Sequence, residues 1–175
     1  MFAKIFRRKD AGHAALDVIA KRVAHLDGMD REFCIHAMKH LIAIREKLEM
    51  KPMPNALSLA PLSKSQFLTL YRILLCYLFV MLFVDDRRAK SAMRRLVTDI
   101  TEGRPADTDR ICDDLELGRS EGQEDPRVQL ARIAWKEAEA CLPVQRSKLV
   151  KLAVTTLALP AHFDFFRDDV RHLFR

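Results

Sequence analysis

The chain has 175 residues, of which 49% are hydrophobic and 31% are charged. This balance is typical of one folded globular domain and excludes a disordered chain. The four cysteines are far apart and form no C-x-x-C pair, so we predict reduced core thiols and no disulfide framework or zinc site. The formal net charge of +6 is compatible with binding to nucleic acid or anionic lipid, but many proteins that bind neither match it.

Residues 1–9 combine basic and aromatic side chains. No apolar segment of signal-peptide type follows them, so we expect no secretory signal. One interpretation of this segment is an interfacial membrane anchor or a nucleic-acid arm. The other is a first turn that packs Phe2 and Phe6 onto the domain while its cations stay in water.

Two amphipathic helices are predicted next, over residues 10–26 and 30–50. Apolar residues recur at three- and four-residue steps in both, and the short connection through Gly28 predicts antiparallel neighbours. The second helix carries His36 and His40, whose i, i+4 spacing places both imidazoles on one face, as a metal pair requires. The alternative is a solvated pair beside Lys39, and we predict no metal or other cofactor.

Closely spaced prolines predict a loop over residues 51–62. A capping box then begins a helix, with Ser63 as the N-cap and Gln66 as the N3 residue. From Phe67 to Val84 this helix is apolar on nearly every side, which is typical of a helix at the centre of a bundle or in lipid. Arg72 favours the bundle, because a charge in lipid costs a few kcal/mol.

The next helix, which ends before Gly103, has the densest basic surface of the chain. Its candidate residues for binding phosphate or a partner are Arg87, Arg88, Lys90, Arg94 and Arg95. Nucleic acid and lipid head groups both supply such phosphates. The alternative is an ordinary solvated face, and we expect no sequence-specific reading of bases, because no set of stacking aromatic side chains accompanies the arginines.

Residues 107–125 reverse the charge. We predict a short helix over 108–117, with Gly118 as its stop, and a flexible loop over 118–125. The acidic segment and the basic helix have opposite charges, so they can also face each other within the fold. That arrangement would remove the main argument for nucleic acid.

Asp125 and Pro126 form a strong helix start. A three-four pattern follows them and predicts a helix up to the boundary at Pro143, with Trp135 packed in the core. The pattern consists of Val128, Ala131, Trp135, Ala138 and Leu142. Helices over 145–159 and 161–174 complete the chain, and the last one has an aromatic face that must dock on its own domain or on a partner.

The sequence therefore predicts an all-α single domain over residues 1–175, with about seven helices around the apolar helix from Phe67 to Val84. No catalytic motif is recognisable, which favours a non-enzymatic adaptor or regulatory subunit that binds another protein through its helix surfaces. An enzyme whose site is built from distant residues stays open. The two alternatives are a nucleic-acid-binding protein that uses the helix around Arg87 to Arg95, and a membrane-associated protein anchored by Phe67 to Val84 or by the N-terminus. We expect a cytoplasmic location, the inner face of a membrane included; the oligomeric state is not specified by the sequence.

Overall fold

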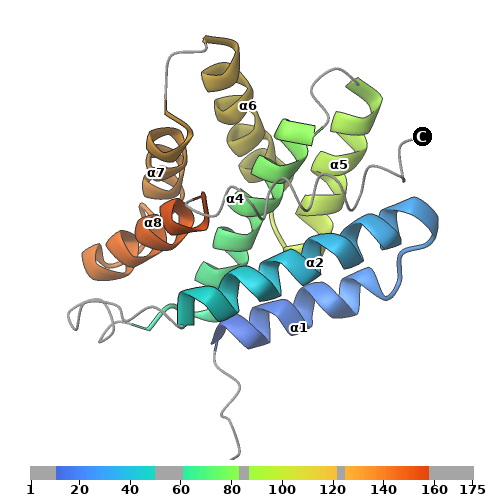
Figure 1. The fold of residues 1–175 in the computed structure, drawn as a ribbon, viewed down its shortest axis with the longest axis horizontal. Helices are drawn as coiled ribbons and strands as arrows, with labels where there is room; N and C mark the ends of the chain where they lie inside the picture. Colours follow the sequence, from blue (N-terminus) through green and yellow to red (C-terminus); the bar gives the residue numbers. More distant parts are fainter. Residues whose placement is uncertain (1–10, 50–60, 83–86, 122–124, 158–175) are drawn as a thin grey trace, which may run out of the picture.

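The computed structural model describes residues 11–49, 61–82, 87–121 and 125–157. Within these ranges every regular element is an α-helix, so the all-α prediction is confirmed, and the helices form one compact domain (Figure 1). The helices are α1 (Ala11–Val23), α2 (Gly28–Glu49), α4 (Lys64–Leu82), α5 (Arg87–Ile100), α6 (Pro105–Glu121), α7 (Pro126–Glu137) and α8 (Pro143–Leu157). The predicted helix over 161–174 and the basic N-terminus lie outside the described residues.

Helix α4 begins at the predicted capping box. The Ser63 amide donates to Gln66 Oε1 at 2.7 Å, and the Gln66 amide donates to Ser63 Oγ at 3.3 Å. Every side chain from Leu70 to Val80 is buried, and α4 packs against α1, α5, α6, α7 and α8. Among the described residues, no helix has the length and hydrophobicity of a membrane-spanning segment.

Helices α1 and α2 form the predicted antiparallel pair, one alongside the other in Figure 1. The predicted stripe of α1 is buried, including Leu16, Ile19 and Val23. The chain turns between the two helices and reaches α2 at Gly28, whose φ of +57° is the left-handed conformation that glycine adopts without strain. From α2, the Phe33 ring packs on Phe79 of α4 with 4.7 Å between ring centroids.

A buried arginine joins α4 to the link between α5 and α6. Arg72 is only 7% exposed, and its Nε donates to Thr101 Oγ1 at 3.0 Å while its Nη2 donates to Thr101 O at 3.2 Å. Burial lowers the pKa of Arg72, and the charge of Asp107 opposes that effect. Gly103 lies directly against the guanidinium: a Cβ added there would be 2.5 Å from Nε. A side chain at position 103 would therefore have to displace the Arg72 guanidinium.

The predicted end of α6 at Gly118 is wrong, because α6 continues through this residue to Glu121. Gly118 is buried inside the helix, and the Gln129 side chain of α7 occupies the space that a Cβ would need. Gln129 Nε2 donates to the carbonyl oxygens of Asp114 and Leu115, at 3.0 Å each. The glycine therefore allows α7 to approach α6 closely. Of the loop predicted over 118–125, residues 122–124 lie outside the described residues.

The helix predicted over 125–142 is shorter in the structure. Asp125 caps α7 as expected, since its carboxylate accepts the Arg127 amide at 2.7 Å. However, α7 ends at Glu137, and α8 begins at Pro143 after a turn. The two helices pack against each other.

Candidate functional site

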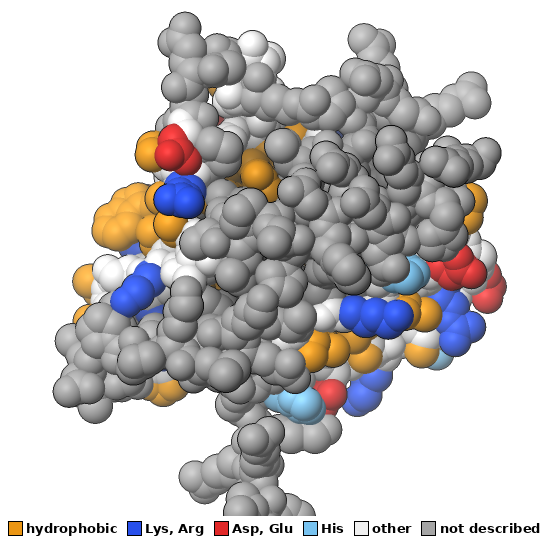
Figure 2. Space-filling view, viewed as in Figure 1, with side chains coloured by type: hydrophobic (Ala, Val, Ile, Leu, Met, Phe, Trp, Pro, Cys, Tyr) orange, Lys and Arg blue, Asp and Glu red, His pale blue; other side chains and the backbone are white. Residues whose placement is uncertain are grey.

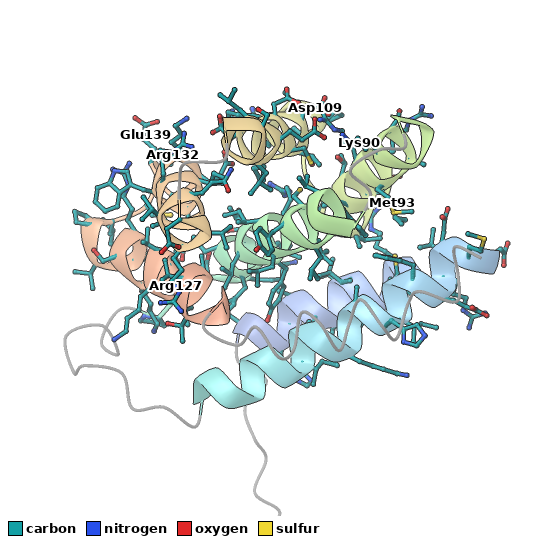
Figure 3. The ribbon with its side chains drawn as sticks, turned by 45° about the horizontal axis from the view of Figure 1, so that its top comes forward. Lys90, Met93, Asp109, Arg127, Arg132 and Glu139 are labelled. Carbon is teal, nitrogen blue, oxygen red and sulfur yellow. The ribbon has the colours of Figure 1, made fainter. Side chains whose placement is uncertain are left out.

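The basic helix α5 faces the acidic helix α6 (Figure 3). Arg94 Nη2 lies 2.8 Å from Asp113 Oδ1, and Arg94 Nη1 lies 3.3 Å from Asp109 Oδ1. Glu116 Oε1 lies 3.4 Å from both Arg94 Nη2 and Lys90 Nζ. The charges of Lys90 and Arg94 are therefore already compensated by carboxylates within the domain.

The carboxylates around Arg94 stabilise the protonated form of its guanidinium. Burial of the guanidinium lowers the pKa, but the hydrogen bond to Asp113 and the neighbouring acids outweigh it, and the pKa is raised overall. A phosphate would have to displace these carboxylates to reach Arg94. Such displacement costs an existing set of charge-assisted hydrogen bonds.

The other basic residues predicted as a phosphate site have separate positions. Arg95 is exposed and its Nη2 donates to Ser91 Oγ at 3.3 Å. Arg87 and Arg88 form the first turn of α5, and their side chains lie outside the described residues. The structure thus brings Lys90 and Arg94 together at α6 and leaves Arg95 apart from them.

A small hollow between α4, α5 and α6 lies beside the same ion pairs. Phe79, Met93 and Cys112 form its apolar side, and Lys90, Arg94 and Glu116 form its charged side. Its space suits roughly one water molecule. It is too small to take an organic substrate or cofactor without movement of the helices.

The histidine pair and the cysteines were the other sequence candidates. His36 is half-buried on α2, and the side chain of His40 lies outside the described residues. Within the described ranges, no three metal-ligating side chains come together. Cys34, Cys76 and Cys112 are buried free thiols. Burial, followed by the Asp30 charge, raises the pKa of Cys34 to about 12, and burial with a hydrogen bond to Cys112 raises the pKa of Cys76. Such thiols are poor nucleophiles at neutral pH.

The prediction that Trp135 packs in the core is wrong. Helix α7 carries two apolar stripes, and the buried one contains Leu130, Ile133 and Ala134. Trp135 lies on the opposite stripe and is 48% exposed. Val128 lies seven residues earlier on the same face of α7 and is 54% exposed.

Two further large apolar side chains are exposed after α7. Leu142, the last residue of the predicted three-four pattern, is 67% exposed, and Val144 at the start of α8 is 43% exposed. Ala138 of the same pattern is buried. We refer to Val128, Trp135, Leu142 and Val144 as the Trp135 surface. Figure 2 shows hydrophobic side chains along this side of the molecule, over α7 and the start of α8, with basic side chains among them. A run of exposed apolar side chains of this kind marks an interaction site more often than isolated exposed residues do.

Arg146 of α8 fixes the position of the indole. Its guanidinium carbon lies 3.8 Å from the Trp135 ring centroid, and its Nε donates to the Trp135 carbonyl oxygen at 2.9 Å. The Arg146 amide also donates to the Leu142 carbonyl oxygen at 2.8 Å. Because Arg146 lies in the first turn of α8 and its guanidinium covers the ring, the start of α8 lies beside Trp135.

The sequence contained a signal for this surface that the periodicity argument missed. Apolar residues occupy two faces of α7, whereas a helix at the edge of a domain needs only one apolar face for its core. The chain matches no protein-family model, and no curated protein or solved structure is significantly similar to it.

Proposed function

We propose that the protein is a non-enzymatic interaction protein that binds a partner protein through the Trp135 surface. The observation that carries the proposal is the half-exposed indole held by Arg146 among exposed aliphatic side chains. Tryptophan and arginine are the residue types most enriched among those that contribute most to protein–protein affinity. An indole already fixed in position also loses little conformational entropy when a partner covers it.

Two features support a protein partner over a nucleic acid at this surface. Arg146 covers one face of the Trp135 ring, although base stacking depends on free aromatic faces. Leu142 and Val144 are aliphatic, and a partner protein can cover them with apolar side chains of its own. Phosphate binding at α5 is less favoured, because Lys90 and Arg94 already pair with the acids of α6.

Site-specific photo-crosslinking in the native cell tests the proposal. A photoreactive amino acid replaces Val128 in one full-length variant and Leu142 in another. Asp99, which is exposed on α5, is the matched control position. We expect discrete protein adducts from positions 128 and 142 but not from position 99. The same adducts should disappear when Trp135→Ala is added to the 128 variant.

Two results would contradict the proposal. One is a set of adducts that is the same at positions 99, 128 and 142, which would mean random collision. The other is adduct formation that persists unchanged with Trp135→Ala, since the ring is the centre of the proposed contact. Folding of each variant is checked by far-UV circular dichroism, which reports the helical content independently of the surface.

A further inference from the structure

Two of the buried cysteines lie next to each other in the core. Cys76 belongs to α4, Cys112 belongs to α6, and both are buried free thiols. The two side chains share a hydrogen bond, and α4 packs directly against α6. A small rearrangement of such side chains brings their sulfur atoms to the bond length of a disulfide, which is about 2 Å. The pair can therefore be joined without unfolding the domain.

The hollow between α4, α5 and α6 leads to one member of this pair. Cys112 is one of the residues that line the hollow, whereas Cys76 is fully buried on α4. Lys90 and Glu116 at the charged side of the hollow are partly exposed, so this side faces the solvent. A small molecule that enters from there meets the sulfur of Cys112 first.

The size of the hollow selects the kind of reagent. Its space suits roughly one water molecule, and hydrogen peroxide is larger than water by a single oxygen atom. Glutathione disulfide, which consists of a pair of tripeptides, does not fit without movement of the helices. The ammonium group of Lys90 also lines the hollow and can donate a hydrogen bond to the hydroxide that leaves when peroxide is cleaved.

We propose that Cys112 and Cys76 form a peroxide-dependent disulfide that ties α4 to α6. The sulfur of Cys112 attacks one oxygen of hydrogen peroxide, the O–O bond breaks, and the thiol proton leaves with the other oxygen as water. The sulfur of Cys76 then attacks the sulfenic acid of Cys112, the S–O bond breaks, and the proton of Cys76 leaves with that oxygen as a second water. The thiols together lose a pair of electrons, and one peroxide is reduced to water.

The surroundings of Cys76 suit the second step. Burial, followed by the hydrogen bond to Cys112, raises the pKa of Cys76, so this thiol stays protonated in the resting protein. The hydrogen bond also keeps it beside the sulfur that it attacks, and such proximity accelerates a reaction within one molecule. Because Cys112 is buried, thiols as large as glutathione reach its sulfenic acid less easily than Cys76 does.

Peptide mapping of the purified full-length protein tests the site. The reduced protein is treated with hydrogen peroxide, its remaining thiols are alkylated in denaturant, and the chain is digested with trypsin. We expect the tryptic peptides 73–87 and 111–119, which contain the two cysteines, to appear as one cross-linked species that lacks two hydrogen atoms. Dithiothreitol should release both peptides, whereas oxidised methionines stay oxidised under this treatment.

Single substitutions assign the two steps. Cys76→Ala should leave Cys112 as a sulfenic acid that dimedone traps, and Cys112→Ala should leave Cys76 unmodified. The matched control is Cys34→Ala, because Cys34 is equally buried on α2 but does not line the hollow. The control should form the cross-link to the same extent as the wild type. Far-UV circular dichroism checks the folding of each variant, and the mapping of the wild type requires no substitution.

The disulfide should also be visible in the stability. It closes the segment of the chain that contains α5, and a closed segment restricts the unfolded chain. The oxidised protein should therefore unfold at higher urea concentration than the same sample after treatment with dithiothreitol. The comparison within one sample cancels the effect of methionine oxidation. A lower urea midpoint in the oxidised form would contradict a bond that ties α4 to α6 in the folded state.

Three other results would overturn the inference. The first is a wild-type protein that shows no cross-link at a peroxide dose which already oxidises Met29, an exposed residue of α2. The second is a cross-link that joins Cys34 or Cys141 as often as it joins Cys76 to Cys112. The third is equally fast cross-linking by glutathione disulfide and by hydrogen peroxide, which would contradict entry through the hollow. None of these results bears on the Trp135 surface.

Discussion

The contact between Gly103 and Arg72 allows a sharp test of the fold. Replacing Gly103 with alanine places a methyl group 2.5 Å from Arg72 Nε and 2.6 Å from Cζ, so the guanidinium must move. It then loses its two hydrogen bonds to Thr101. Hydrogen bonds to charged groups contribute about 1.5–3 kcal/mol each. We therefore expect Gly103→Ala to lower the free energy of unfolding by about 3 kcal/mol.

A double-mutant cycle shows whether Arg72 is the cause. Arg72→Ala alone should also cost about 3 kcal/mol, because it removes the same hydrogen bonds and leaves a cavity. Gly103→Ala added to Arg72→Ala should then change the stability by less than about 0.5 kcal/mol, since the methyl group meets empty space.

Urea unfolding followed by far-UV circular dichroism gives all four stabilities. The reasoning is refuted if Gly103→Ala is equally destabilising with and without Arg72. It is also refuted if Gly103→Ala has no effect in the wild type, because the guanidinium would then leave its site at no cost.

Three further predictions use other contacts. Gly118→Ala should destabilise the chain by about 1–3 kcal/mol although alanine favours helices, because it displaces Gln129 from α6; in a Gln129→Ala background the same change should stabilise by up to about 1 kcal/mol in urea titrations. Arg94→Met should cost about 1 kcal/mol at low salt and less in 1 M salt, because its carboxylate partners are partly exposed. The hydrogen bond from Arg104 lowers the pKa of Asp107, so its stabilisation is present above the unfolded pKa of about 3.9 and is lost as the pH falls through the lower folded value; Asp107→Asn should flatten the decrease of the urea midpoint below about pH 4.

Each of these predictions has a distinct contrary outcome. A stabilising Gly118→Ala in the wild-type background would mean that Gln129 moves aside without penalty. An effect of Arg94→Met that is independent of salt would assign its contribution to packing of the aliphatic chain rather than to charge. A parallel pH dependence in Asp107→Asn and wild type would show that other carboxyl groups control the stability in acid.

The helix starts could be predicted because their determinants are local. The capping box at Ser63 and the cap at Asp125 each involve residues two or three positions apart, and the structure contains both. The buried stripe of α1 could be predicted equally well, because that helix has one apolar face. These features require no knowledge of what the helix packs against.

The errors concern contacts between segments distant in the sequence. Gly118 is a stop signal in isolation, but the Gln129 side chain of a different helix makes it an interior contact. Trp135 belongs to one of two apolar stripes on α7, and only the packing of α7 on α4 and α8 decides which of them is buried. Arg72 was interpreted only as an argument against lipid, since its partner Thr101 is supplied by a distant turn.

The charge pairing between α5 and α6 was foreseen only as an alternative. Opposite charge in two segments indicates that they can attract, but the distance of 2.8 Å between Arg94 Nη2 and Asp113 Oδ1 depends on the placement of both helices. Because this placement pairs the basic side chains of α5 with acids, we propose the stripe around Trp135 as the functional surface instead. Periodicity alone assigns Trp135 to the core.

Hydroxyl-radical footprinting tests the central claim most directly. The oxidation of Trp135 is measured in the purified chain and in living cells, and Met29 serves as an internal control because it is 55% exposed on α2. Trp135 should oxidise readily in the purified protein and be protected severalfold in the cell, while Met29 stays equally reactive in both. Equal reactivity of Trp135 in the two settings would contradict a partner at this surface, and protection already present in the purified chain would contradict the exposed indole itself.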